Sequence, residues 1–283
     1  MLFKKIIVLI FLLCANLVLA NEKESTTEQT PDSDFSWQFM INMAAVYDPV
    51  ILKDVELNGI EDFVAFSLSL DLYYKGFYIQ SNQRRLGSQF YSSEIGYQLI
   101  NKDDWAIDIL TKSYLSGYSP KYLIEDQSKP IPTLDGLDDR DSGNGIALRY
   151  SRFIGNDLFS VEFASLGVLS KADGWLIDSF YSHLIQYRNW DIYLGGGATF
   201  YSSRVMDYYL GVDLNEANEY RSEYQADSAV RLQAEIFAQH PISESWSFSA
   251  GITQNYYSNN VVDSPLADKQ YITQILIGVM YVF

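Results

Sequence analysis

The sequence predicts an all-β protein, a closed antiparallel transmembrane β-barrel of about 12 strands with short periplasmic turns and long outer loops. Three observations predict this fold. Apolar residues recur at every second position along most of the chain, which is the pattern of strands with one apolar face. The connections between these strands alternate between tight turns and longer segments, as at the two rims of a membrane barrel. The outward faces carry Phe, Leu, Val and Trp, where contact with water would require polar residues.

Two segments precede the predicted barrel. Residues 1–20 begin with the basic stretch "MLFKK" and continue with an apolar run ending in small residues, so they predict a secretory signal peptide cleaved between Ala20 and Asn21. The apolar run is short for a spanning helix of about 20 residues, which argues against the alternative of an uncleaved anchor. Residues 21–34 are polar and charged without apolar periodicity, so we expect a disordered periplasmic leader there. The barrel then occupies residues 35–283.

The composition favours strands and argues against several functions. The chain contains 22 Tyr and 16 Phe, a load that suits an all-β protein with many turns. Its formal net charge of −16 argues against a nucleic-acid partner, because neutralising phosphates requires clustered Lys and Arg. The single cysteine, Cys14, lies in the predicted signal peptide. The mature chain therefore has no thiolate nucleophile, disulfide or cysteine-based zinc site, and we expect no cofactor and no metal.

The strands can be placed in order from the alternation. Odd positions are apolar through 35–47, even positions through 64–72, and "KG" at 75–76 predicts a tight turn into the third strand. The clearest alternation lies in 229–239, whereas both faces of 175–188 mix apolar and polar residues. Further strands are expected to start near Gln89, Asp104, Gly145, Leu158, Gly174, Trp190, Ser228, Ser245 and Gln270.

The connections between these strands alternate strictly in length. The even-numbered connections are tight, at 75–76, 101–104, 155–157, 188–189 and 243–245. The odd-numbered connections are longer, at 49–61, 84–88, 117–143, 170–174, 203–227 and 258–269. A soluble sandwich or a lipocalin-like barrel has no reason to alternate in this way, whereas a membrane barrel has tight periplasmic turns and extended outer loops. An even number of strands places both ends of the barrel on the periplasmic side.

The last predicted strand is the stretch "YITQILIGVMYVF" at 271–283. Its odd-numbered face is apolar and should meet lipid, and the strand should close the barrel against residues 35–47, because closure removes exposed edges. A C-terminal aromatic residue with apolar residues at alternate positions resembles the sorting signal that the barrel-assembly machinery recognises. The residues of this signal are Ile277, Val279, Tyr281 and Phe283.

Residues from about 205 to 283 are similar to the MltA-interacting protein/OmpV family. That family carries a "YYGV" element, a strand that opens on Trp after a tight turn, an "SP" after an acidic residue and a terminal "Y-x-F". The matching residues are Tyr208, Tyr209, Gly211 and Val212 with Leu210 inserted, then Trp246, then Asp263, Ser264 and Pro265, and finally Tyr281 and Phe283.

The resemblance implies an outer-membrane location and a non-enzymatic function. One branch of the family is described as a scaffold that joins a lytic murein transglycosylase to a peptidoglycan synthase, and other members as porin-like or adhesive. We therefore expect a scaffold or binding protein linked to murein machinery, with a narrow porin-like channel for small solutes or a surface adhesin as the alternatives. The expected partners are outer-membrane lipid and lipopolysaccharide, the barrel-assembly machinery and a periplasmic murein hydrolase or synthase.

The residues that could carry catalysis form no recognisable constellation. The predicted mature chain has two histidines, His183 and His240. Ser182 cannot act as a nucleophile for His183, because neighbouring residues of a strand point to opposite faces. The acidic loop 134–141 fails the spacing of a calcium loop, so we expect a solvated outer loop, with weak divalent-cation binding as the alternative.

Three further features stay open at the level of sequence. Most Tyr and Trp residues should form girdles at the membrane interfaces, but Tyr208 and Tyr209 open a long loop and could stack on a ligand or pack across the barrel mouth. The glycines at 195–197 are expected to ease a bend or close side-chain packing. Inward-facing charges of both signs could pair and plug the lumen or line a narrow aqueous path. These charges are Asp108, Lys112, Arg149, Arg231 and Glu235.

Overall fold

The computed structural model describes residues 35–81, 86, 93–127 and 129–283. The predicted signal peptide and leader lie outside the described residues, as does the strand start expected near Gln89. Within the described residues, the element order contains 12 strands and four short helices. The strands are β1(Phe35–Tyr47), β2(Val64–Tyr74), β3(Phe77–Gln80), β4(Glu94–Asn101), β5(Trp105–Ser113), β6(Asn144–Ile154), β7(Asp157–Ser165), β8(Trp175–Tyr187), β9(Trp190–Tyr201), β10(Ala229–Pro241), β11(Trp246–Tyr257) and β12(Tyr271–Val282).

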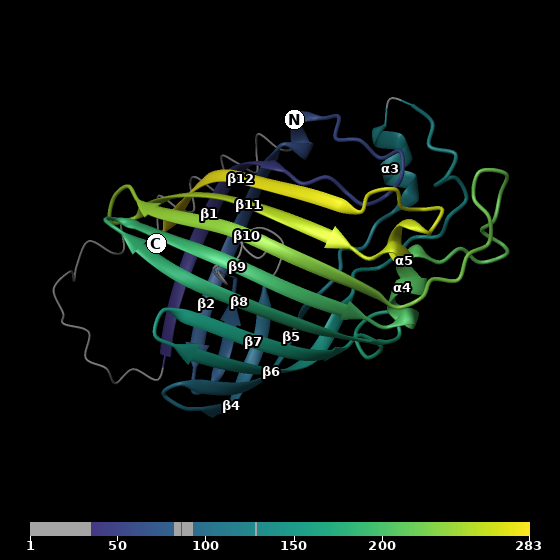
Figure 1. Ribbon diagram of the computed structural model, residues 1–283. Helices are drawn as coiled ribbons and strands as arrows, with labels where there is room; N and C mark the ends of the chain where they lie inside the picture. Colours follow the sequence, from purple (N-terminus) through teal and green to yellow (C-terminus); the bar gives the residue numbers. More distant parts are fainter. Residues whose placement is uncertain (1–34, 82–85, 87–92, 128) are drawn as a thin grey trace. The chain divides into compact units, whose positions relative to one another are not determined.

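These strands form a closed antiparallel barrel, as the sequence predicted (Figure 1). Each strand pairs with its neighbours in sequence, and β12 closes the barrel by pairing with β1 from Met40↔Val282 to Tyr47↔Ile275. Closure leaves neither strand as an edge of the sheet, so their backbone donors and acceptors are paired without water.

The period-two alternation places the apolar face of each strand outside. Along β12, Ile275 and Ile277 are exposed, whereas Leu276 and Met280 are buried inside the barrel. On β2, Phe66 is likewise exposed. This exposed apolar belt matches the lipid-facing surface of a membrane barrel.

The two ends of the barrel differ, as the alternating connections predicted. At one end, which we call the short-turn rim, the strands are joined by turns at 75–76, 102–104, 155–156, 188–189 and 242–245. The other end, the long-loop rim, carries the loops at 48–63, 114–143, 166–174, 202–228 and 258–270. By the general rule for outer-membrane barrels, the short-turn rim faces the periplasm and the long-loop rim faces outward.

The helices, which the sequence did not predict, gather at the long-loop end (Figure 1). They are η1(Ile60–Asp62), α3(Pro120–Asp126), α4(Ser203–Leu210) and α5(Asn259–Val262). The described part of the chain has no helix of the length and apolarity needed to cross a membrane.

Aromatic side chains line both rims in the manner of the expected girdles. At the short-turn rim, Trp190 stacks on His240 with ring centroids 4.7 Å apart. At the long-loop rim, Trp175 stacks between Phe163 and Phe200, at 5.9 and 5.5 Å. Such rings sit favourably at headgroup level, because they combine an apolar body with a polar edge.

The glycine run of β9 permits close packing inside the lumen. A Cβ on Gly197 would lie 2.9 Å from the Ser179 carbonyl oxygen and 3.0 Å from the Phe180 ring, and a Cβ on Gly195 would lie 2.6 Å from the same ring. On Gly196, which faces outward, the nearest atom would be 3.8 Å away. The expectation of close side-chain packing is therefore confirmed at Gly195 and Gly197, but not at Gly196.

This packing makes a testable prediction for two adjacent glycines. We expect Gly197→Ala to lower the free energy of unfolding by about 1–3 kcal/mol, because the added methyl group overpacks the lumen wall. Gly196→Ala should be neutral or slightly stabilising, because it reduces only the freedom of the unfolded chain. Urea titration of each variant, folded in lipid vesicles, measures its free energy of unfolding. An equal loss of stability in the two variants would contradict the assigned packing.

Candidate functional site

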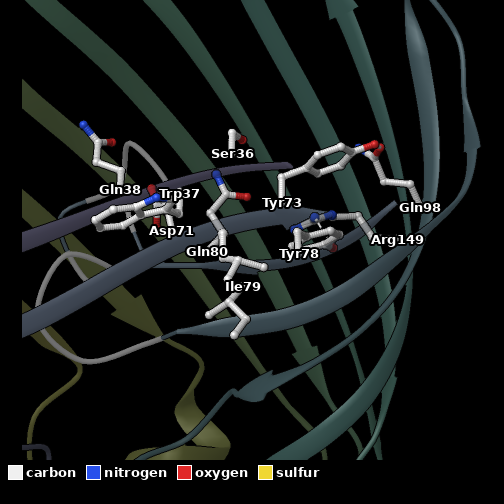
Figure 2. Close-up of a pocket in the computed structure, with 11 residues that line it drawn as sticks. Ser36, Trp37, Gln38, Asp71, Tyr73, Tyr78, Ile79, Gln80, Gln98 and Arg149 are labelled. Carbon is white, nitrogen blue, oxygen red and sulfur yellow. Dashed lines mark hydrogen bonds between the residues drawn. The ribbon is translucent and has the colours of Figure 1, made fainter. Parts of the chain in front are cut away.

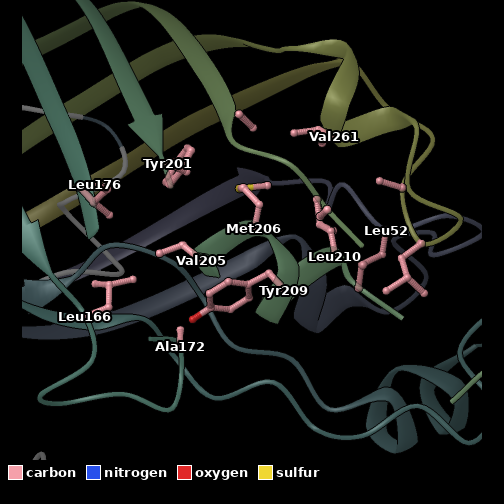
Figure 3. Close-up of a cluster of buried hydrophobic side chains, with 14 of the residues drawn as sticks. Leu52, Leu166, Ala172, Leu176, Tyr201, Val205, Met206, Tyr209, Leu210 and Val261 are labelled. Atoms are coloured by element: carbon pink, nitrogen blue, oxygen red, sulfur yellow. The ribbon is translucent and has the colours of Figure 1, made fainter. Parts of the chain in front are cut away.

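The outer loops share one hydrophobic core, which we call the outer cap (Figure 3). It joins Leu52 of the β1–β2 loop, Leu134 of the β5–β6 loop, Val205 of α4 and Val261 of α5. The same buried cluster includes inward-facing residues of strands β5 to β10, namely Leu110, Ala147, Ala164, Leu176, Tyr201 and Ala229. One continuous core thus joins four of the outer loops to the inner face of the barrel, and the outer cap lies over the long-loop mouth.

Two family-motif segments that lie far apart in the sequence meet in the outer cap. The Ser264 hydroxyl donates a hydrogen bond to the Leu210 carbonyl at 2.6 Å, and Val212 is buried beside them. The inserted Leu210 is itself buried in the core of the cap. This part of the motif therefore lies in the core that holds the cap together.

The two tyrosines of the motif pack the cap and fasten it to the β5–β6 loop. The Tyr209 hydroxyl donates to the Asp141 carbonyl at 2.7 Å, and the Asp141 backbone N–H donates to the Tyr208 hydroxyl at 2.8 Å. The Tyr118 hydroxyl donates to the Tyr209 carbonyl at 2.7 Å, and burial raises the pKa of Tyr118 to about 12. Of the two roles left open by the sequence, the structure shows packing across the mouth.

The remaining motif residues lie at the other end of the barrel. Trp246 opens β11 at the short-turn rim and contacts Tyr281 with ring centroids 5.0 Å apart. Phe283 lies 4.7 Å from Tyr281 and 5.4 Å from Phe39 of β1. The residues of the predicted sorting signal thus lie on the closing strand and beside its partner β1.

The four aspartates of loop 134–141 are exposed, as expected of a solvated outer loop, but the loop also has a buried side that the sequence did not show. Leu134 and Leu137 are buried in the outer cap, and Arg140 forms a bidentate ion pair with Glu216 at 3.0 and 2.9 Å. The sequence showed the aspartates of this loop, but it did not show that Arg140 pairs with the distant Glu216. Among the described residues, no group of three or more His, Cys, Asp or Glu is placed to hold a metal ion.

Arg221 ties the same loops together from inside the cap. It is 1% exposed, and its guanidinium donates to the carbonyls of Glu216 and Thr133, the latter at 2.6 Å. Burial lowers the pKa of Arg221 from its usual value. Backbone carbonyls that would otherwise be orphaned in the cap are thereby satisfied.

The Arg140–Glu216 pair predicts that acid loosens the outer cap. Burial alone would raise the pKa of Glu216, but hydrogen bonds from Arg140 and from the backbone N–H groups of Asp138 and Asp213 hold it below its usual value of 4.5. A lowered folded-state pKa stabilises the cap above pH 4.5, and this contribution is lost as the pH falls through the lowered value. Intrinsic amide exchange slows as the pH falls, so the expected result is a drop in the protection factors of the cap amides in acid, measured by hydrogen exchange and corrected for the intrinsic rate.

The Glu216→Gln variant is the control for this prediction. The cap amides of this variant should be less protected from hydrogen exchange at neutral pH. Their protection should also fall less in acid, because no carboxylate remains at position 216. An acid response of the same size in the variant would assign the effect to other carboxylates.

Inside the barrel, Arg149 of β6 is the centre of a buried ion cluster. Its Nη1 donates to both carboxylate oxygens of Glu94, at 2.8 and 3.0 Å. Its Nε and Nη2 donate to Asp108 Oδ2 at 3.2 Å, and Nη2 also donates to the Tyr78 hydroxyl at 2.8 Å. Low-dielectric surroundings strengthen such charge-assisted contacts, provided that each charge keeps its partners.

The other lumen charges named from the sequence also have partners on neighbouring strands. Arg149 and Lys112 pair with carboxylates, whereas Arg231 and Glu235 bind threonine hydroxyls. The contacts are Lys112 with Glu162 at 2.8 Å, Arg231 with Thr199 at 2.9 Å, and Glu235 with Thr253 at 3.0 Å. The alternating pattern predicted five lumen charges, Asp108, Lys112, Arg149, Arg231 and Glu235. It did not identify their partners Glu94 and Glu162, because that requires the register between the strands.

A polar cavity lies at the short-turn end of the lumen, and we call it the short-turn vestibule (Figure 2). Its volume is about 380 Å³. The lining includes Ser36 and Gln38 at the start of β1, Tyr73 near the end of β2, Gln98 near the end of β4, and Arg149. Because these strand ends lie next to the short turns, the cavity belongs to the periplasmic half of the barrel.

The two histidines lie outside these features. His183 faces outward near the short-turn rim, where its Nδ1 is 2.5 Å from Asp157 Oδ1, and the Tyr181 hydroxyl donates to the same oxygen at 3.0 Å. Ser182 points into the barrel, as the alternation required. His240 places its Nδ1 3.0 Å from the Asn189 carbonyl. Neither contact supplies the nucleophile that a hydrolase needs.

Comparisons with known proteins give one family match and several similar solved structures. A family described as "MltA-interacting protein MipA" matches residues 50–283. No curated protein matches the chain. Among solved structures, the chain is similar to a loop L8 deletion mutant of OmpT, an outer membrane protein of Vibrio cholerae, at 8% identity over 88% of this chain and 99% of that one, with a TM-score of 0.39.

A second similar structure is the outer membrane channel DcaP of Acinetobacter baumannii, at 7% identity over 92% of this chain and 100% of that one, with a TM-score of 0.38. The family match extends over most of the chain and includes every strand from β2 to β12. The protein is thus an outer-membrane β-barrel, and it belongs to the MltA-interacting protein MipA family.

Proposed function

We propose that this protein is a non-enzymatic scaffold of the outer membrane that binds cell-wall machinery at its periplasmic side. The outer cap carries the proposal, because a core that joins the long loops to the lumen wall leaves the barrel closed on its outer side. The ion cluster around Arg149 adds a second obstruction deeper in the lumen. The short-turn rim and the leader then provide the binding surface.

The family description supports a murein enzyme as the partner. It names interaction with MltA, which is a murein enzyme. The rim that holds Trp246, Tyr281 and Phe283 would face this partner, and the same C-terminal residues would serve as the assembly signal during insertion. Residues 1–20 would direct export, and residues 21–34 would extend from the barrel into the periplasm.

The decisive experiment is periplasmic crosslinking followed by purification from solubilised envelopes. We expect the full-length protein to recover a murein hydrolase or synthase. The variant that lacks residues 21–34 separates binding by the leader from binding by the rim. Recovery of no murein enzyme by either form would overturn the proposal.

A narrow channel is the alternative, and the water-accessible short-turn vestibule is the observation in its favour. Planar-bilayer recordings distinguish the two functions. A capped scaffold should show no steady conductance, whereas steady single-channel currents from the purified protein would establish a path through the cap and the ion cluster.

A further inference from the structure

We propose that the short-turn vestibule is a binding site for an uncharged sugar of one or two rings. The inference rests on the proposed function and deepens it, because it names a ligand class for the periplasmic side. The vestibule lies between the start of β1 and the ends of β2 and β4, where a ligand from the periplasm would enter.

The size of the cavity limits the ligand. At about 380 Å³ the vestibule is at the lower end of the range of about 300–1,000 Å³ that is usual for small-molecule sites. This volume suits a monosaccharide or a disaccharide, and therefore the end of a glycan chain. It has no room for a folded protein segment.

The walls of the vestibule offer uncharged hydrogen-bonding groups beside one carboxylate, Asp71, whose Oδ1 accepts from the Ser81 backbone N–H at 2.6 Å. The side chains of Ser36 and Gln38 are exposed to the cavity and make no hydrogen bond within the described part of the chain. Gln98 uses its Oε1 to accept from the Tyr73 hydroxyl at 3.3 Å, which leaves its two Nε2 donors for a ligand. Hydroxyl and amide groups both donate and accept, as sugar hydroxyl and acetamido groups also do.

The floor of the vestibule argues against an anionic ligand. The guanidinium of Arg149 is saturated by Glu94, Asp108 and the Tyr78 hydroxyl, so none of its donors is left for a carboxylate or a phosphate. Around it, the carboxylates of Glu94, Asp108 and Glu162 outnumber the cations Arg149 and Lys112. The resulting negative potential repels anions from the cavity.

An aromatic ring completes the match to a sugar. Tyr73 is 37% exposed, and its hydroxyl is directed toward Gln98 (Figure 2). The ring can cover the apolar C–H face of a pyranose while the amides bind its hydroxyl groups. Small-molecule sites commonly combine an apolar wall with a few well-placed polar groups in this way.

The test is binding of N,N′-diacetylchitobiose to the full-length protein purified in detergent, measured by calorimetry and by saturation-transfer NMR. Maltose serves as a second neutral sugar, glucuronic acid as an anionic probe and spermidine as a cationic one. We expect the neutral sugars to bind, and the double variant Gln38→Ala, Gln98→Ala to bind them about tenfold more weakly or less.

Gln186→Ala is the matched control, because Gln186 is a glutamine at the short-turn end of β8 and lies outside the vestibule. It should bind like the wild type. Ser36→Trp, at an exposed position, should block binding by filling the entrance without disturbing the fold.

Three results would overturn the inference: no binding of either neutral sugar, preferential binding of glucuronic acid or spermidine, or unchanged sugar binding in the double variant. The scaffold function fails separately, when crosslinking recovers no murein enzyme. Recovery of the enzyme by a protein that binds no sugar would reject the sugar site alone.

Discussion

Replacing Arg149 with alanine is expected to lower the free energy of unfolding by about 3–5 kcal/mol, the largest effect of any single substitution in the lumen. The substitution leaves Glu94 and Asp108 buried without their cation, and both carboxylates are almost fully shielded from solvent. The cost arises from unpaired buried charge rather than from the value of the intact pair. Urea titration in lipid vesicles, followed by tryptophan fluorescence, measures the loss.

Arg152→Ala is the control on the same strand. Arg152 faces outward and pairs with Asp104 at 2.8 Å, but the two side chains are 39% and 53% exposed. We expect its loss to cost about 0–1 kcal/mol, as for other exposed ion pairs. Similar losses for the two variants would mean that water replaces the guanidinium in the lumen.

If Arg149→Ala does not fold, Arg149→Lys should fold with an intermediate loss of stability, because it keeps the charge without the bidentate geometry.

The barrel could be predicted from the sequence because its cause is local. Each residue of a strand faces lipid or lumen according to its parity, so the exposed Phe66 and the buried Met280 are both visible as positions in an alternating pattern. Membrane topology then fixes the alternation of turns and loops. Parity also identified Arg149 as an inward-facing charge.

The partners of Arg149 could not be predicted in the same way. The odd or even position of a residue in a strand shows whether it faces the lumen. It does not show how far along the barrel axis the residue lies. Glu94 reaches Arg149 across two intervening strand pairings, in which Ile95 lies opposite Thr111 and Asp108 lies opposite Arg149. Those registers depend on how each loop folds and on a bulge between Gln98 and Ile100, and the alternating pattern shows neither.

The outer cap was missed for a different reason. Its core residues follow no helical or strand period, and Leu134 and Leu137 are isolated among aspartates. The motif residues Ser264 and Leu210 make contact only after the loops fold over the mouth. A resemblance could mark these positions as shared within a family, but only the folded loops show that they pack against each other.

The cap should open without unfolding the barrel when Leu210 is replaced by aspartate. Leu210 is 4% exposed, and an unpaired carboxylate at its position costs several kcal/mol unless the loops separate. Leu210 itself belongs to α4, outside the strand ladder, so we expect the barrel hydrogen bonds to remain. We expect trypsin to cut after Arg221, which is 1% exposed in the intact cap, while the protein keeps its folded mobility on unheated gels.

Leu214→Asp is the matched control for this experiment, because it makes the same chemical change in the same loop at a side chain that is 76% exposed. It should leave Arg221 protected, since an exposed carboxylate has no desolvation cost. Mass spectrometry of the fragments separates cleavage after Arg221 from cleavage at exposed sites such as Arg204. Protection of Arg221 in Leu210→Asp would contradict the assigned core, and complete unfolding of that variant would show that cap and barrel fold as one cooperative unit. Selective cleavage would instead establish the cap as a separately opening closure over a stable barrel.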